Sequence, residues 1–239
     1  MIIIAGSGRS GTSAVAKLLH TAGIRVGRDL IEPDAGNPDG YFEERAVVRV
    51  NESILHDAGL DGWFSTASRA RVREASRPHR DVMRALVRDA TPAWKDPRFC
   101  WTLEAWLEVL PADPRVIVCL RSPAEVVAST LHYYGLAGDE PRRAIEHLWR
   151  AEHARLLDVI RDHRLDATSV AYAALHGAGA RAEIAALSRF AGRPLDPAGV
   201  RRDLRHHAAP VAPEFATLYD AVRSLSAPYR APARRAAGR

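Results

Sequence analysis

Residues 6–13 (GSGRSGTS) hold the side chains and the backbone whose types and spacing could do chemistry. They follow an apolar, β-branched run at residues 1–5 that predicts a buried strand, and they lead into residues 14–20, which predict a helix. Glycine permits the positive φ angles and the close backbone approach of such a turn, and hydroxyl groups can act beside the free amides of a helix N-terminus. The glycines are Gly6, Gly8 and Gly11, and the hydroxyls belong to Ser10, Thr12 and Ser13. This order of strand, turn and helix predicts a binding site for an anion such as phosphate or sulfate.

The glycine spacing of this loop is that of the phosphate-binding pattern G-x-x-x-x-G-K-[ST]. Gly6 and Gly11 fit the pattern, but Thr12 occupies the position of its lysine. The cation of the loop is Arg9 instead, inside the turn. A tight connection without a ligand is the plain alternative for any glycine-rich turn. A kinase or ATPase without its lysine fits the loop less well than a different anion chemistry does.

The 239-residue chain is long enough for one α/β domain with a substantial core. We expect this domain at residues 1–226, followed by a disordered basic tail at residues 227–239. The formal charge is +5, but only Lys17 and Lys95 of the 34 basic residues are lysines. The excess of basic residues consists of arginines spread along the whole chain, and such a spread is as typical of a genomic composition bias as of a binding surface. We therefore expect no nucleic-acid partner.

Cysteine content and hydropathy bear on the compartment. Cys100 and Cys119 are too few for a disulfide scaffold and lie in or beside apolar segments, so both are expected to be reduced and buried. No apolar run reaches the roughly 18 residues of a membrane span, and residues 1–5 lack the basic start and the length of a signal peptide. No His and Cys residues cluster at metal-ligand spacing, so we expect no metal site. These features predict a cytoplasmic protein without a membrane span.

Short apolar runs that alternate with amphipathic segments predict an α/β fold, a single domain with a central, mainly parallel sheet flanked by helices. The clearest strand is residues 115–120, an unbroken apolar run typical of a parallel strand covered on both faces. A short strand ends at Lys95, and another spans residues 168–172. Helices are expected at residues 12–22, from the 41–44 region to about 55, and at 77–89, 103–110, 124–134, 140–163 and 180–191.

Three cations follow predicted strands at their carboxyl ends: Arg9, Lys95 and Arg121. Ligands of open α/β sheets bind in the crevice outside these ends, so the three cations are expected to converge on one site. A phosphotransferase of the P-loop type places a magnesium-binding aspartate where this chain has Arg121. A fixed cation there changes the expected site from metal-binding to directly anion-binding.

The loop and a second motif together resemble the sulfotransferases that use 3′-phosphoadenosine 5′-phosphosulfate, most closely their bacterial branch. The second motif is Arg121-Ser122-Pro123, with Ser129 eight residues after the arginine. The two motifs at this separation are far more specific than either alone. Further matching segments are residues 37–43, 95–98 and 170–175, so that the resemblance covers roughly residues 1–210. It implies a sulfotransferase with the P-loop NTPase-like fold of that family.

The resemblance also implies a role for each matching residue. The 5′-phosphosulfate would be bound by Gly8, Arg9, Ser10, Gly11, Thr12 and Ser13, and the 3′-phosphate by Arg121 and Ser129. Tyr172 would lie by the adenine, although Ala173 and Ala174 replace the acidic residues that often follow it. Arg205, in a late basic segment at residues 201–207, would lie near the 3′-phosphate. A solvated charge at a helix end explains Arg205 equally well.

The mechanism that the resemblance implies is in-line transfer to an acceptor hydroxyl or amine, without a metal. A base takes the acceptor's proton, and Arg9 and Lys95 stabilise the charge on the departing phosphate oxygen. Our first choice for the base is Glu43 and our second is Glu32, with Asp96 and His132 as further alternatives. Each acid could instead be a helix-start charge that complements the dipole.

The acceptor and two competing functions stay open. A small molecule or a carbohydrate is expected as the acceptor, in a pocket built from residues 61–80 and 133–139, where Trp63, Phe64, Tyr133 and Tyr134 could form an aromatic wall or part of the core. The polar residues 61–76 fit a mobile cover and an ordinary surface loop equally well. The alternatives are a magnesium-dependent small-molecule kinase and, on charge alone, a nucleic-acid-binding module.

Overall fold

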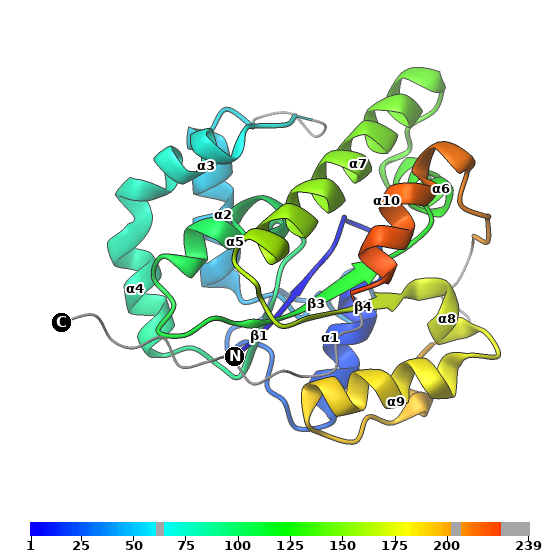
Figure 1. The fold of residues 1–239 in the computed structure, drawn as a ribbon, viewed down its shortest axis with the longest axis horizontal. Coiled ribbons are helices and arrows are strands. Elements are labelled where there is room, and N and C mark those ends of the chain that lie inside the picture. Colours follow the sequence, from blue (N-terminus) through cyan, green and yellow to red (C-terminus); the bar gives the residue numbers. More distant parts are fainter. Residues whose placement is uncertain (61–64, 202–206, 226–239) are drawn as a thin grey trace.

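A computed structural model describes residues 1–60, 65–201 and 207–225. Four strands form one parallel sheet in the order β2-β1-β3-β4 (Figure 1). They are β1 (Ile2–Ala5), β2 (Ala93–Lys95), β3 (Arg115–Leu120) and β4 (Ala167–Ala171). β1 lies between β2 and β3, because Ile4 is paired to Lys95 on one side and to Ile117 on the other. The loop that follows β1 therefore emerges between the carboxyl ends of β2 and β3.

Helices cover both faces of this sheet (Figure 1). They are α1 (Thr12–Thr21), α2 (Arg45–Asp57), α3 (Arg69–Ser76), α4 (Arg80–Arg88), α5 (Phe99–Leu107), α6 (Pro123–Tyr134), α7 (Asp139–Asp162), α8 (Tyr172–His176), α9 (Ala180–Ala191) and α10 (Pro213–Arg223), with short 3₁₀ turns at Arg77–His79 and Pro197–Gly199. Successive side chains of β1 point to opposite faces. Ile3 joins the larger core with α2 to α7 and α10, whereas Ile4 joins a smaller core with α1, α8 and α9.

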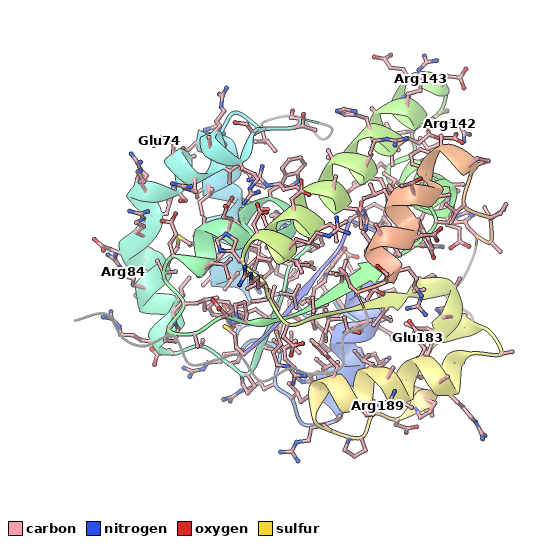
Figure 2. The ribbon with its side chains drawn as sticks, in the orientation of Figure 1. Glu74, Arg84, Arg142, Arg143, Glu183 and Arg189 are labelled. Atoms are coloured by element: carbon pink, nitrogen blue, oxygen red, sulfur yellow. The ribbon has the colours of Figure 1, made fainter. Side chains whose placement is uncertain are left out.

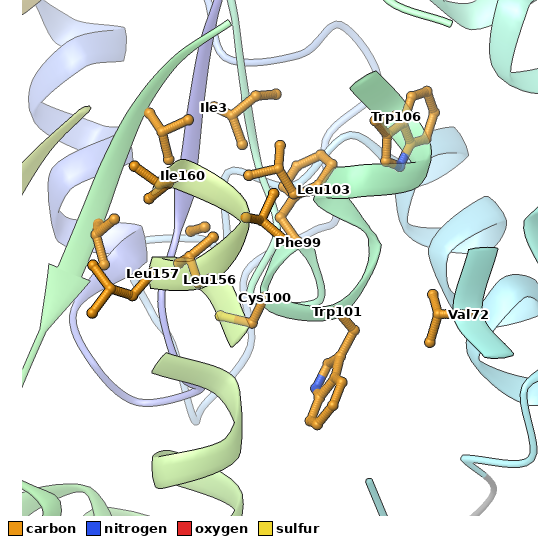
Figure 3. Close-up of a cluster of buried hydrophobic side chains, with 14 of the residues drawn as sticks. Ile3, Val72, Phe99, Cys100, Trp101, Leu103, Trp106, Leu156, Leu157 and Ile160 are labelled. Carbon is orange, nitrogen blue, oxygen red and sulfur yellow. The ribbon is translucent and has the colours of Figure 1, made fainter. Parts of the chain in front are cut away.

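The larger core is rich in aromatic side chains from α5. Figure 3 shows Ile3 of β1 close to Phe99 and Leu103 of α5, with Leu156 of α7 nearby. Trp106, also on α5, is fully buried and packs edge-on against Trp94 of β2, with ring centroids 5.2 Å apart. This packing fixes the end of β2, where Lys95 lies, against the helical layer.

The arginines are spread over the outer helices. Figure 2 labels Arg84 on α4, Arg142 and Arg143 on α7, and Arg189 on α9, and all four are exposed. These helices lie on different sides of the molecule. These exposed arginines are therefore spread over several helices, as expected for a chain that is rich in arginine along its whole length.

The structure confirms the predicted parallel α/β fold and corrects several elements. Residues 69–76, predicted as a cover or a loop, form α3, which Val72 anchors in the core and Arg69 ties to Glu104 at 2.6 Å. The helix expected at residues 103–110 is α5 at Phe99–Leu107. Its start was not predicted because nearly every residue of α5 is buried, so the sequence shows no separate polar face. α8 and α10 were not predicted. The tail at residues 227–239 lies outside the described residues.

The first turn of the loop depends on Gly6. Its φ is +144°, and a Cβ built on it would lie 2.4 Å from the carbonyl oxygen of Cys119 on β3. Gly8 lies in the same loop, but a Cβ there would meet no atom within 4 Å. The close approach of the loop to β3 therefore needs glycine at position 6 and tolerates a side chain at position 8.

We predict that Gly6→Ala lowers the free energy of unfolding by about 2 kcal/mol or more, since the added methyl group meets rigid backbone. The matched variant Gly8→Ala should change it by less than about 1 kcal/mol. Denaturant unfolding without ligand measures both. Equal effects of the two substitutions would contradict the close approach of Gly6 to β3.

Candidate active site

A cavity of about 770 Å³ opens at the carboxyl edge of the sheet. Its walls are formed by the loop after β1, residues 35–41, the ends of β2 and β3, the C-terminal half of α6 and the start of α8. The three predicted cations Arg9, Lys95 and Arg121 all line it. The expectation that they converge is therefore met.

The loop presents the start of α1 to this cavity. Gly11 is the N-cap of α1, and the first backbone bond of the helix runs from the Val15 amide to the Gly11 carbonyl at 3.2 Å. As at any helix start, the amides before Val15 have no acceptor within the helix, and such amides can bind an anion. The Ser10 amide instead closes the turn onto the Ser7 carbonyl at 3.1 Å. Of the predicted loop residues, all but Ser10 line the cavity; they are Gly8, Arg9, Gly11, Thr12 and Ser13.

Ser10 is placed differently from its neighbours. Its side chain is buried, and its hydroxyl oxygen has no hydrogen-bond partner among the described residues. A buried hydroxyl without a partner costs free energy, so a ligand or water at this position would stabilise the loop. Its contribution to an anion site would come from the hydroxyl, because its amide is already bonded within the turn.

Arg9 has a left-handed backbone, with φ of +63°. Its Nε donates to the Ser129 hydroxyl at 3.1 Å, and its guanidinium carbon lies 4.5 Å from the centre of the Tyr133 ring. α6 thus holds the side chain of the loop's cation through one hydrogen bond and one cation–π contact. Ser129, expected at the 3′-phosphate, contacts Arg9 in this structure.

Arg121 is 5% exposed and is held by three groups. Its Nε donates to Glu125 at 2.9 Å, and Nη1 donates to the carbonyl oxygen of Arg9 at 3.0 Å. Its guanidinium carbon lies 4.4 Å above the ring of Tyr172. Tyr172 also lies against the loop, since a Cβ on Gly11 would be 2.4 Å from its ring. Tyr172 therefore lines the cavity beside both motifs.

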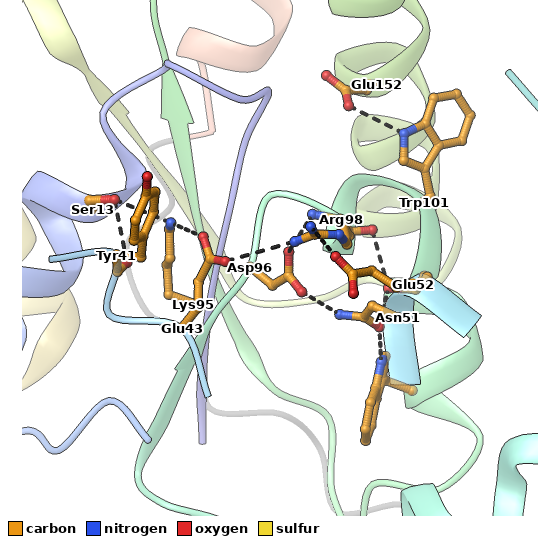
Figure 4. Close-up of polar contacts among 12 residues, drawn as sticks. Ser13, Tyr41, Glu43, Asn51, Glu52, Lys95, Asp96, Arg98, Trp101 and Glu152 are labelled. Carbon is orange, nitrogen blue, oxygen red and sulfur yellow. Dashed lines mark hydrogen bonds and ion pairs between the residues drawn. The ribbon is translucent and has the colours of Figure 1, made fainter. Parts of the chain in front are cut away.

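Lys95 and Glu43 form a buried ion pair (Figure 4). The ammonium is 2.5 Å from Glu43 Oε1 and 3.2 Å from the Ser13 hydroxyl, and the two side chains are 2% and 8% exposed. Burial raises the pKa of Glu43, while the Lys95 charge lowers this pKa and the nearby Asp96 charge raises it. The pair places a carboxylate and a cation beside the Ser13 hydroxyl in the first turn of α1.

The other candidates for the base are less well placed. Asp96 is fully buried and accepts hydrogen bonds from Asn51 at 2.8 Å and from Arg98 at 3.1 Å, so it organises the end of β2 (Figure 4). His132 lines the cavity and is exposed, whereas Glu32 is exposed and is not among the lining residues. Arg205 lies outside the described residues, as do Trp63 and Phe64.

The expected acceptor segments are only partly confirmed as cavity walls. Tyr133 and Tyr134 line the cavity, but none of the described residues at 65–80 does. The reason is that these helices pack on other helices. α3 packs on α2 and α5, and α4 packs on α2; Val72 and Met83 bury them in the larger core.

Residues 34–41 contribute contacts that the sequence did not indicate. Tyr41 OH lies 2.8 Å from Asp34 and 3.0 Å from Tyr133 OH, so that this turn meets α6 across the cavity mouth. Asn37 donates to the Ser13 hydroxyl at 3.1 Å. The density of turn residues indicated a structured loop, but no spacing in the sequence indicates its docking on α1.

A buried acid, Glu152 of α7, lies behind the loop and was also missed. It accepts from Trp101 Nε1 at 3.2 Å, and its Oε2 has no hydrogen-bond partner among the described residues. Burial raises its pKa to about 7, and the polar side chains of Ser7 and Trp101 oppose this rise. The sequence did not indicate that Glu152 is buried, because a glutamate on a long amphipathic helix usually faces solvent.

We predict that Glu152→Gln removes a pH-dependent loss of stability. Because the pKa of Glu152 is raised in the folded protein, the folded state binds the extra proton between about pH 4.5 and 7, and stability falls as the pH rises through this window. The variant should therefore be more stable than the wild type at pH 8 and close to it at pH 4.5. The exposed acid Asp158 on the same helix offers the control Asp158→Asn, and parallel pH profiles for wild type and Glu152→Gln would contradict the assignment.

Within residues 1–60, 65–201 and 207–225, no group of three or more His, Cys, Asp or Glu residues could hold a metal ion. In the same described part of the chain, no helix has both the length and the apolar character that crossing a membrane requires.

Neither protein-family models nor curated proteins match this sequence. Among solved structures, the sulfotransferase domain from the Synechococcus PCC 7002 olefin synthase has a TM-score of 0.53 at 20% sequence identity, over 98% of this chain and 90% of that chain. The sulfotransferase domain from the curacin biosynthetic pathway has a TM-score of 0.49 at 16% identity, over 96% of this chain and 92% of that chain. The likeness to the olefin synthase domain shows that this chain has the α/β fold of that domain.

Proposed function

We propose that the protein is a sulfotransferase that transfers a sulfuryl group from 3′-phosphoadenosine 5′-phosphosulfate to a hydroxyl or amine of a small-molecule or carbohydrate acceptor. The observation that carries the proposal is the convergence of Arg9, Lys95 and Arg121 on one cavity, at the carboxyl edge of a sheet with this fold. Cations in fixed positions suit a ligand that carries two separate anionic groups.

The residues present fit such a donor. Arg9 and the amides at the start of α1 would hold the 5′-phosphosulfate in the cavity, and Ser10, which is buried and does not line the cavity, would support the loop. Arg121 and Ser129 would hold the 3′-phosphate, and Tyr172, which also lines the cavity, would lie by the adenine. The cavity of about 770 Å³ lies within the usual range of small-molecule sites, about 300–1,000 Å³. A contribution from Arg205 stays a prediction.

The catalytic step requires a proton acceptor and a stabilised leaving group. When bound, the donor supplies the sulfuryl group and a phosphate as the leaving group. Glu43 is the proposed base for the acceptor's proton, because it is buried beside the loop and its pKa is raised. Lys95 contacts both Glu43 and the Ser13 hydroxyl, so its ammonium can turn from the carboxylate toward the leaving oxygen.

We predict that 3′-phosphoadenosine 5′-phosphate raises the melting temperature by roughly 5 °C at saturating concentration. Arg9→Gln should abolish most of this shift, since it removes the loop's cation. Arg84→Gln is the matched control, because Arg84 is exposed on α4 and pairs locally with Asp81. Differential scanning fluorimetry measures the shift, and no shift of the wild type would count against the proposed donor.

We predict that Glu43→Gln lowers kcat by about 10²-fold or more while the affinity for 3′-phosphoadenosine 5′-phosphate changes little. Glu32→Gln serves as the control and as the test of the second candidate base. Single-turnover assays with the sulfated donor and a panel of phenols, sugars and amines measure the rate. Near-normal turnover of Glu43→Gln would remove Glu43 from the mechanism.

The same assay separates the proposal from a magnesium-dependent kinase. With the sulfated donor, addition of a chelator should leave the rate unchanged, because the proposed cations belong to the protein. ATP-dependent phosphorylation of the acceptor that stops with the chelator would favour the kinase instead.

A further inference from the structure

Ser122 and Glu125 have the sequence of a capping box, in which the two residues bond each other's backbone amides at a helix start. Here Ser122 is the N-cap of α6, but its side chain caps nothing and donates instead to the Pro210 carbonyl at 3.0 Å. Glu125 Oε1 accepts from the Ala209 amide, also at 3.0 Å. Both members of the box bind residues 207–212, which we call the strap. They do so in place of capping the helix.

The second oxygen of the same carboxylate binds Arg121. Glu125 Oε2 lies 2.9 Å from Arg121 Nε, and the two side chains are 1% and 6% exposed. Arg121 in turn donates to the Arg9 carbonyl at 3.0 Å. One buried carboxylate therefore connects the strap, the second motif and the loop.

This connection determines where the Arg121 guanidinium points. Two of its N–H groups are used by Glu125 and Arg9, its face lies on Tyr172, and a guanidinium has further N–H donors. Arg121 lines the cavity, and its further N–H groups have no hydrogen-bond partner within the described part of the chain, so they can face a ligand at the cavity wall. Without the carboxylate, the guanidinium would lose its buried counter-charge and its fixed direction.

We infer that Glu125 is a positioning residue for nucleotide binding. It orients Arg121 toward the 3′-phosphate and fastens the strap at the edge of the cavity, where His207 of the strap is a lining residue. This inference rests on the proposed function. Its energetic basis is preorganisation, because a guanidinium that is already oriented loses little entropy when a phosphate binds.

The test compares two ligands, 3′-phosphoadenosine 5′-phosphate and adenosine 5′-phosphate, by calorimetry. Glu125→Gln should weaken the binding of 3′-phosphoadenosine 5′-phosphate by about tenfold or more, because a charge-assisted contact to the 3′-phosphate is lost. The binding of adenosine 5′-phosphate should weaken by less than about threefold. Glu140→Gln, at an exposed acid in the first turn of α7, should change neither. An unchanged affinity for the first ligand, or an equal loss for both, would overturn the inference.

A second variant and a second measurement keep the test independent of folding and of the donor. Glu125→Asp keeps the charge but is too short to reach both partners, so it should show the same selective loss to a smaller degree. Hydrogen exchange of the Ala209 amide without ligand should be faster in both variants, and unchanged exchange would overturn the strap contact. If the wild type does not distinguish the two nucleotides, the proposed donor fails, while the exchange result still decides whether Glu125 fastens the strap.

Discussion

The close approach of Gly6 to the Cys119 carbonyl is the constraint on which the site depends. β1 is paired on both sides, so its following loop must leave between β2 and β3 with no room for a side chain at its first residue. As a result, the Arg9 carbonyl accepts a hydrogen bond from Arg121, and Ser13 in the first turn of α1 contacts Lys95. The cavity lies where parallel strands end, as is general for open α/β sheets.

Paired charge is the second feature of the site. Lys95 with Glu43 and Arg121 with Glu125 are nearly inaccessible to solvent. Burying such ions is costly, and each pair keeps its cation in place because an unpaired buried charge would cost more. The proposed donor would therefore meet cations whose positions are already fixed. A site of this kind recognises an anion by geometry as well as by charge.

The sequence predicted the parts of the fold that local pattern controls. The apolar run at residues 115–120 and the helix expected at residues 180–191 have the predicted boundaries in β3 and α9. α3 and α5 were predicted less well for opposite reasons. α3 is a polar helix held by Val72 and by the distant partner Glu104, whereas α5 is buried on all sides and shows no polar stripe. In both, tertiary contacts outweigh local periodicity.

By itself, the sequence determined the glycine-rich turn between β1 and α1, its displaced cation Arg9, and the strand ends that carry Lys95 and Arg121, because these follow from residue type and order within each strand and the turn after it. Only the tertiary structure decided that Glu43 pairs with Lys95 and that Glu125 joins Arg121 to the strap. The physical reason is that Glu43 and Lys95 come from segments distant in the chain, as do Glu125 and the strap. Their pairing is fixed by packing and by the energetic need to neutralise buried charge, which no local pattern records.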